Sequence, residues 1–221
     1  MMDRDRLLEV REVAFALQDK VLLAPVSFEL DKGEFIWLTG PSGAGKSTLL
    51  KIIASLLEPA SGEVRFNGEP IGTLKPERYR QQVSYCFQNP LLFGSTVYDN
   101  LALPYHVRRR PPQRQMMIEG LARLNLPAAT LERTVDQLSG GEKQRVALLR
   151  NVQFSPDILL LDEITSALDD PNKRAVRQLI DEQVRQGTAA VWISHDRQET
   201  VGSERILTLV APQNGGQHGS T

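Results

Sequence analysis

The sequence has one cysteine, no long apolar run and almost no net charge. The single cysteine, Cys86, excludes an internal disulfide and fits a reducing cytoplasm. It lies in the apolar segment 83–87, so we expect a small packed side chain and not a reactive thiol. Apolar runs such as 158–161 are far shorter than the roughly 18 residues of a membrane-spanning helix. Any function across a membrane would therefore require a partner chain.

The charge balance excludes a general attraction to nucleic acid. The formal net charge is -1 and the sequence pI is near 6.3, so a nucleic-acid partner would need a local basic patch. We interpret residues 108–110, three arginines, as a solvated loop, with contact to a partner or an anionic lipid as the alternative. We expect no signal peptide, because residues 1–6 are charged and no useful apolar stretch follows.

The most informative segment is a glycine-rich loop that fits the pattern GxxxxGK[ST] at every position. It consists of Gly40, Pro41, Ser42, Gly43, Ala44, Gly45, Lys46, Ser47 and Thr48. Residues 34–39 before it predict a buried strand, and residues 47–57 carry apolar side chains at helical spacing. In this context the loop binds the phosphates of a nucleoside triphosphate. The alternative is a glycine-rich turn that binds nothing.

Each residue type in the loop has a chemical reason. The glycines let several backbone N–H groups converge on phosphate oxygens, at the positive end of the following helix dipole. Lys46 adds a mobile charge for the β- and γ-phosphates. Ser47 offers a hydroxyl to Mg²⁺, and Thr48 is expected to make a second phosphate contact.

Strand and helix patterns alternate along most of the chain, which predicts an α/β fold with a largely parallel, mixed core sheet. Residues 7–13 and 26–30 predict an N-terminal antiparallel β subdomain. Further expected elements are a strand with a turn at 63–68, a short helix at 75–82, a strand at 83–87, helices at 113–124 and 141–154, a strand at 158–161, a helix at 172–185, and strands at 189–193 and 205–210.

Strand signals vanish after residue 89, where helical segments are separated by Arg-Pro and Leu-Pro breaks. We therefore expect one domain over 1–210, with a helical subdomain at about 89–155 inserted in the α/β core. The tail at 211–221 is expected to be disordered.

Two carboxylates follow the apolar run 158–161, at the end of a strand where ligands bind in open α/β sheets. We expect Asp162 to hold Mg²⁺, usually through water, and Glu163 to act as general base on the attacking water. A cap or a solvated pair of carboxylates is the alternative. The phosphate loop in the same chain favours the catalytic interpretation.

A second anion-binding helix start is predicted at residues 138–142, Leu-Ser-Gly-Gly-Glu. Ser139 can cap the helix, while Gly140 and Gly141 let backbone N–H groups approach an anion closely. An ordinary capped helix with a flexible entry is the alternative.

These elements, with Gln88 before the second helix start and His195 after the carboxylates, resemble the nucleotide-binding domain of ABC transporters, a P-loop ATPase. The resemblance covers residues 7 to about 210. It implies an ATPase at the cytoplasmic face of the inner (cell) membrane, peripheral and paired with an integral-membrane permease, without a nucleic-acid partner. It also implies a nucleotide-dependent homodimer, in which ATP held by Lys46, Ser47 and Asp162 of one copy is covered by Ser139 and Gly141 of the other.

Further roles follow from the resemblance. Gln88 matches the glutamine loop, which contacts Mg²⁺ and water, residues 166–169 match the D-loop at the dimer interface, and His195 matches the switch histidine. By themselves, Gln88 would be a surface polar residue and His195 a structural one. The sequence departs from the family at two places. Leu17 stands where an aromatic ring usually stacks on adenine; either Phe15, two residues earlier, substitutes for it, or base stacking is weak. Ile164 replaces a common proline.

Several stretches resemble the ATP-binding subunits of bacterial iron exporters more narrowly. They are residues 80–94, 96–100 and 149–165, and the unusual Ile164 belongs to this likeness. The resemblance implies iron export. Export of a lipid, lipoprotein or drug is the nearest alternative, followed by a soluble ABC ATPase of DNA repair or translation control, and by a module that binds ATP without hydrolysis.

Overall fold

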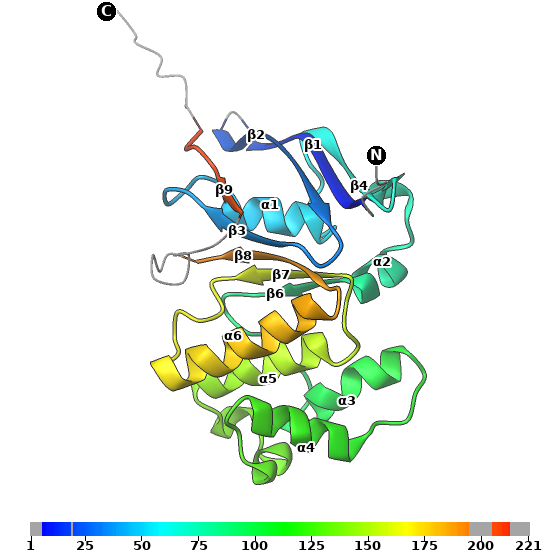
Figure 1. The fold of residues 1–221 in the computed structure, drawn as a ribbon, viewed down its shortest axis with the longest axis vertical. Helices are drawn as coiled ribbons and strands as arrows, with labels where there is room; N and C mark the ends of the chain where they lie inside the picture. Colours follow the sequence, from blue (N-terminus) through cyan, green and yellow to red (C-terminus); the bar gives the residue numbers. More distant parts are fainter. Residues whose placement is uncertain (1–5, 19, 195–204, 213–221) are drawn as a thin grey trace, which may run out of the picture. The chain divides into compact units, whose positions relative to one another are not determined.

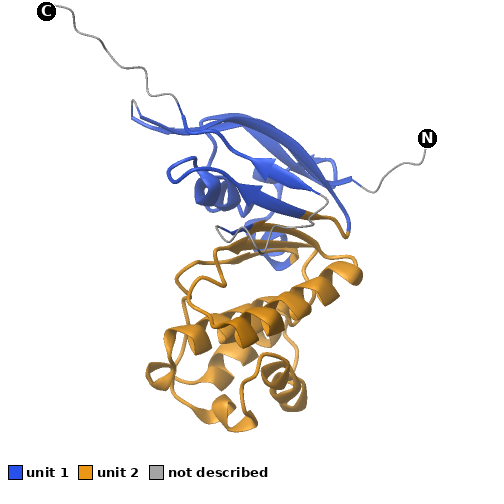
Figure 2. Cartoon of the chain, turned by 60° about the vertical axis from the view of Figure 1, so that its left-hand side comes forward, with its two compact units in different colours: residues 1–32, 36–81, 193–221 blue, residues 33–35, 82–192 orange. Residues whose placement is uncertain are grey.

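The computed structural model describes residues 6–18, 20–194 and 205–212. The chain divides into two compact units (Figure 2). Unit 1 comprises Met1–Lys32, Ile36–Gln81 and Ile193–Thr221, and unit 2 comprises Gly33–Phe35 and Gln82–Trp192. The α/β fold class is confirmed. The domain limits and the inserted helical subdomain at about 89–155 stay predictions.

Unit 1 contains the expected antiparallel sheet, with strand order β2-β1-β4-β5 (Figure 1). Its strands are β1 (Arg6–Leu17), β2 (Lys20–Asp31), β4 (Ser61–Phe66) and β5 (Glu69–Pro70). The first two are longer than predicted, because the pairing shifts between Val10 and Val13. Glu12 there has a left-handed φ of 47°, as in a β-bulge, and the extra residue interrupts the alternation.

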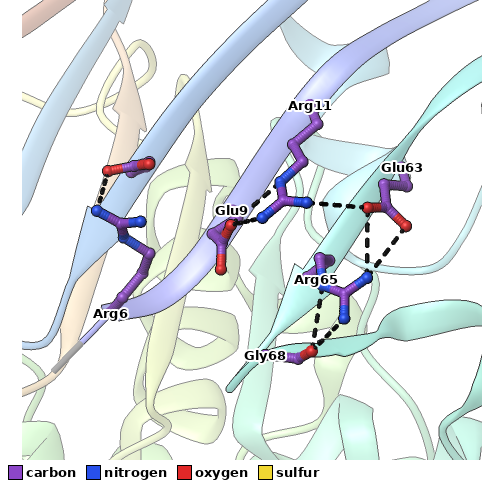
Figure 3. A network of polar contacts seen from close by, with 7 residues as sticks. Arg6, Glu9, Arg11, Glu63, Arg65 and Gly68 are labelled. Carbon is purple, nitrogen blue, oxygen red and sulfur yellow. Dashed lines mark hydrogen bonds and ion pairs between the residues drawn. The ribbon is translucent and has the colours of Figure 1, made fainter.

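One face of this sheet is covered by paired charges (Figure 3). Arg11 bonds to Glu9 and lies 3.4 Å from Glu63, which is 3.3 Å from Arg65. Arg65 also donates to the Gly68 carbonyl. Exposed pairs of this kind are screened by water and contribute little to the stability of a fold. Their main effect is to keep this face solvated, while Leu8 and Val10 lie buried.

Two further elements of unit 1, β3 (Phe35–Thr39) and α1 (Lys46–Ile53), flank the phosphate loop in the chain. Strand β3 runs parallel to β9 (Ile206–Thr208). A short 3₁₀ helix, η1 (Ile71–Thr73), and helix α2 (Pro76–Gln82) follow the antiparallel pair β4–β5.

Helix α1 is shorter than the predicted 47–57, because a Schellman turn ends it. Ser55 has a left-handed φ of 54°, and its N–H bonds to the Ile52 carbonyl at 2.9 Å. The N–H of Leu56 reaches back to the Lys51 carbonyl at 2.9 Å. These two bonds satisfy carbonyls that the last helical turn leaves without partners.

Unit 2 contains β6 (Val83–Cys86), β7 (Ile158–Asp162) and β8 (Ala189–Ile193), in the order β6-β7-β8. Strands β6 and β7 pair in parallel, as expected. Every residue of β7 and β8 is buried, which is typical of a sheet covered on both faces. The helical elements are α3 (Val97–Val107), α4 (Arg114–Arg123), η2 (Ala128–Glu132), η3 (Val135–Gln137), α5 (Gly140–Val152) and α6 (Asp170–Arg185).

Helix α3 has no counterpart of its own among the predicted ranges, because Pro104 lies inside it. Its first turn is strongly capped: Thr96 and Asp99 form a capping box, and Asp99 Oδ2 accepts from the Thr96 and Ser95 N–H groups at 2.8 and 2.9 Å. These bonds lower the pKa of Asp99. Within the described ranges, no helix combines the length and the hydropathy needed to cross a bilayer.

Candidate functional site

The glycine-rich loop lies in unit 1 and has the backbone that its composition predicts. Gly40, Gly43 and Gly45 have φ of 141°, 79° and 88°. A Cβ at Gly45 would lie 2.4 Å from the Leu22 carbonyl oxygen, and one at Gly40 would lie 2.6 Å from that of Leu209. A Cβ at Gly43 would meet nothing within 4 Å. Gly40 and Gly45 are therefore required by close packing, and Gly43 by its backbone conformation.

Lys46 lies at the first turn of α1 and closes the loop on itself. Its buried Nζ donates to the carbonyls of Gly40 at 2.9 Å and Pro41 at 3.0 Å. The first turn contains no acidic residue, and Gly45 precedes it without a side-chain cap. An ammonium group and the positive end of a helix dipole thus lie together, which suits the phosphates of a nucleotide.

The remaining loop residues complete this arrangement. The Ala44 N–H donates to the Pro41 carbonyl at 3.2 Å and closes a turn that exposes Ser42. Ser47 and Thr48 follow in the first helical turn and are half-buried. A serine hydroxyl is an oxygen donor that suits Mg²⁺. The individual ligand contacts of these residues stay predictions.

In unit 2, Asp162 is the buried last residue of β7, as expected. The sequence did not indicate its partner: the Tyr85 hydroxyl donates to Asp162 Oδ2 at 2.6 Å. Burial raises the pKa of Tyr85 far above its usual value, and the hydrogen bond with Asp162 raises it further, so the phenol is the donor. The only sequence signal was a tyrosine in a strand predicted to lie in the same sheet.

Gln88 and Glu163 lie together in unit 2. The Gln88 side-chain amide donates to Glu163 Oε2 at 2.9 Å. Glu163 has a left-handed φ of 48°, and its carbonyl accepts from the Ser166 N–H at 3.2 Å and from Oγ at 3.0 Å. Non-glycine residues hold such a φ only where their surroundings enforce it. The third predicted catalytic residue, His195, lies outside the described residues.

Helix α5 anchors the loop that contains Gln88. Gln144 Nε2 donates to the Phe87 carbonyl at 3.1 Å, and Asn151 Nδ2 donates to the Tyr85 carbonyl at 3.1 Å. Sequence reasoning did not single out either side chain, because their partners lie more than fifty residues away. The end of β6 and the first residue of the loop after it are thereby tied to one helix.

Ser139 caps α5, as predicted. Its Oγ accepts from the Glu142 N–H at 3.2 Å, and Glu142 Oε2 accepts from the Ser139 N–H at 2.7 Å. Burial raises the pKa of Glu142, but the Ser139 N–H and the guanidinium of Arg133, at 2.7 Å, together lower it. The carboxylate therefore stays charged and holds the helix start in place.

The two glycines of this helix start differ in their surroundings. A Cβ at Gly140 would meet nothing within 4 Å, whereas one at Gly141 would lie 3.0 Å from the Leu168 side chain. Gly140 therefore leaves open space for an approaching group. Gly141 lets α5 pack against the predicted D-loop, residues 166–169.

Arg145 connects α5 to two other elements of unit 2 and was not indicated by the sequence. It is buried, and burial lowers its pKa, although Glu142 and Asp169 oppose that change. Its Nη1 donates to the Leu124 carbonyl and to Asn172 Oδ1, both at 2.7 Å. The helix that begins at Ser139 is thus fixed to the end of α4 and the start of α6.

The two candidates for adenine contact lie near the end of β1. Phe15 is half-buried and pairs with Leu23 across the sheet, while Leu17 is 63% exposed. Leu23 also borders the phosphate loop, since a Cβ at Gly45 would lie 3.0 Å from its Cβ. Phe15 is therefore paired with a residue beside the loop. Its stacking on adenine stays a prediction.

Cys86 should react slowly with thiol reagents in the native protein. Burial raises its pKa to about 11, and the side chain lies 3.0 Å from Asn151 Nδ2. Only the thiolate is nucleophilic, so its population at neutral pH is lower than for a free cysteine of pKa near 8.5. We expect labelling by dithionitrobenzoate to be at least about 100-fold slower in buffer than in denaturant. Equal rates would contradict the packed state of this thiol.

Residues 23–166 match the ABC transporter family. The chain therefore belongs to that family and is an ABC-type ATPase, the nucleotide-binding subunit of a transporter.

Two similar sequences illustrate the relationship. The chain is 50% identical over 210 residues to the Escherichia coli (strain K12) "Probable iron export ATP-binding protein FetA", covering 95% of this chain and 93% of the relative. It is 32% identical over 200 residues to "Energy-coupling factor transporter ATP-binding protein EcfA1" of Mycoplasma pneumoniae (strain ATCC 29342 / M129 / Subtype 1), covering 89% and 73%.

Solved structures agree with this membership. "Structure of ATP binding subunit of ABC transporter" has a TM-score of 0.82 at 28% identity and covers 92% of this chain and 85% of its own. "Structure of a bacterial Atm1-family ABC exporter with ATP bound" has a TM-score of 0.83 at 28% identity. That match covers 95% of this chain and 38% of the exporter chain.

Proposed function

We propose that this chain hydrolyses ATP to drive iron export by a separate integral-membrane permease, to which it binds at the cytoplasmic face of the cell membrane. The observation that carries the proposal is 50% identity over 95% of the chain to a relative named as an iron export ATP-binding protein. Within the described part of the chain, no motif position is occupied by a residue unsuited to its role, and this supports the proposal that the chain hydrolyses ATP. The iron part rests on the relative's name.

In this proposal the phosphate loop and Lys46 bind the nucleotide phosphates, while Ser47, Asp162 and Gln88 provide oxygen donors for Mg²⁺. These groups fit the cation, because hydroxyl, carboxylate and amide oxygens are the ligands it prefers. When bound, Mg²⁺ would neutralise charge on the phosphate oxygens. Glu163 accepts a proton from the attacking water, and the 2.9 Å bond from Gln88 restricts the rotation of its carboxylate.

We propose that hydrolysis takes place in a head-to-tail homodimer. The helix start at Ser139, Gly140 and Gly141 of one copy would cover the γ-phosphate bound by the loop of the other. The open space at Gly140 and the N–H groups of the first turn of α5 support this role. ATP would then join two copies, and hydrolysis would release them, so that binding free energy is linked to association.

The segment that follows Gln88 in the chain exposes apolar side chains suited to contact with the permease. Leu91 and Phe93 are large, apolar and exposed, and Phe93 is 52% exposed. Arg150 fixes this segment: it donates to the Leu91 carbonyl at 2.9 Å, and its guanidinium lies 4.9 Å from the centre of the Phe93 ring. The segment is continuous with the Gln88 loop, so its displacement by a partner would reach the residue that bonds to Glu163.

The proposal is tested first by whether a neighbouring reading frame encodes a multi-span permease, and then by reconstitution of the chain with that permease. We expect Fe²⁺ in the vesicle system to stimulate ATP hydrolysis and to be transported, whereas lipid or drug cargo should not stimulate it. Equal stimulation by an unrelated cargo would contradict iron export. Co-purification with ribosomes or DNA, and with no membrane protein, would contradict a transporter role.

Contact of the permease with the exposed residues Leu91 and Phe93 is tested by a separate variant. Phe93→Ser should reduce the amount of permease that co-purifies with the chain, because the exposed apolar ring is lost. Met116→Ser is the matched control, since Met116 is 55% exposed on α4. Equal loss of permease with both variants would contradict docking at Phe93.

A further inference from the structure

The buried hydroxyl of Tyr85 donates a hydrogen bond to the Asp162 carboxylate within unit 2. The distance of 2.6 Å is in the short range, about 2.5–2.7 Å, of hydrogen bonds from a hydroxyl to a carboxylate. Tyr85 and Asp162 are both buried. A buried bond of this type constrains both partners, because breaking it would leave a carboxylate oxygen in an environment poor in water.

The register of the parallel strands explains why these two residues meet. Tyr85 of β6 pairs with Leu160 of β7, and Asp162 lies two residues further along β7. Side chains alternate between the two faces of a sheet, so Asp162 lies on the same face as Leu160. Two residues of a strand span roughly 6.6 Å, a length that an extended tyrosine side chain covers. The hydroxyl thus reaches the carboxylate without distortion of either strand.

The position of the Tyr85 ring is itself fixed. The ring packs edge-on against Phe87, with centroids 4.5 Å apart and an angle of 72° between the planes. Its backbone carbonyl accepts a hydrogen bond from Asn151 Nδ2 at 3.1 Å. The donor therefore has little freedom in either ring or backbone.

We propose that Tyr85 is a positioning residue, which holds the Asp162 carboxylate in the orientation that binds the divalent cation of the nucleotide. The carboxylate torsion of an aspartate is intrinsically broad. A donor fixed to Oδ2 therefore determines where the other oxygen points. This inference rests on the proposed function, because it concerns the same Mg²⁺–ATP site. It assigns no proton transfer to Tyr85.

The test is Tyr85→Phe, which removes the hydroxyl and keeps the ring on Phe87. The probe is Mn²⁺, titrated by electron paramagnetic resonance into the full-length protein with a non-hydrolysable ATP analogue. We expect the Mn²⁺ dissociation constant to rise about tenfold, as is common when a residue that orients a metal ligand is changed. The Mg²⁺ concentration for half-maximal hydrolysis should rise similarly, while turnover at saturating Mg²⁺ is largely retained.

Tyr79→Phe is the matched control. Tyr79 is also buried and donates its hydroxyl, but to the Ile53 carbonyl in unit 1. This variant should keep the Mn²⁺ affinity of the unmodified protein. Thermal unfolding of both variants and nucleotide binding in EDTA separate a loss of folding from a loss of metal affinity.

Three outcomes would overturn the inference. Unchanged Mn²⁺ affinity in Tyr85→Phe would show that the hydroxyl does not orient Asp162 for the cation. An equal loss of nucleotide binding in EDTA would show a merely structural role. If the unmodified protein neither bound nor hydrolysed ATP, the proposed function would fail and the inference with it. If the unmodified protein bound and hydrolysed ATP but Tyr85→Phe kept the same Mn²⁺ affinity, the inference alone would be refuted.

Discussion

Glu163→Gln should abolish most ATP hydrolysis while leaving ATP binding intact. An amide cannot accept the proton of the attacking water, and loss of a general base commonly lowers turnover by about 10²- to 10⁴-fold. The amide has nearly the shape of the carboxylate, and its oxygen can still accept the bond from Gln88 that now measures 2.9 Å. Phosphate release measures turnover, and isothermal titration calorimetry measures binding. Nucleotide-dependent dimerisation should also persist and is measured by light scattering.

Glu182→Gln is a suitable control for this experiment, because Glu182 pairs with Arg123 at the surface of unit 2. Surface pairs contribute about 0–1 kcal/mol, so both turnover and stability should change little. Turnover of Glu163→Gln near that of the unmodified protein would remove Glu163 as the general base. Loss of ATP binding would instead indicate that its left-handed turn shapes the site.

The second large effect is expected for Gly45→Ala, which should weaken ATP binding by more than tenfold and destabilise unit 1. The φ of 88° costs an L-residue about 1–2 kcal/mol. The new Cβ would also lie 2.4 Å from the Leu22 carbonyl oxygen, so the loop or β2 must move. Overpacking of this kind adds about 1–3 kcal/mol. Calorimetric titration and thermal unfolding measure the two effects.

Gly68→Ala separates the two causes. Gly68 has a similar φ of 78°, but a Cβ there would meet nothing within 4 Å. This variant should lose only about 1 kcal/mol of stability and bind ATP normally. If Gly45→Ala were no worse than Gly68→Ala, close packing against Leu22 would not determine the shape of the phosphate loop.

Secondary structure was predictable where one pattern dominated locally. The buried strand β8 was predicted with its observed limits, because a short apolar run between breaks has few alternatives. Prediction failed where local exceptions interrupt the pattern. The bulge near Glu12 shortened the expected β1, and Pro104 concealed helix α3, whose stability comes from its capped first turn and the buried Asn100.

The amino-acid sequence by itself determined the motifs of this protein: a phosphate loop, a pair of carboxylates at a strand end and a capped helix start. These depend on neighbouring residues and on the backbone freedom of glycine, which a sequence displays directly. Only the tertiary structure decided which side chains hold the motifs in place. Tyr85 donates a hydrogen bond to Asp162, and Arg145 of α5 bonds to the end of α4 and the start of α6. The physical reason is sequence separation: Tyr85 and Asp162 are 77 residues apart, and the register of two parallel strands alone brings them together.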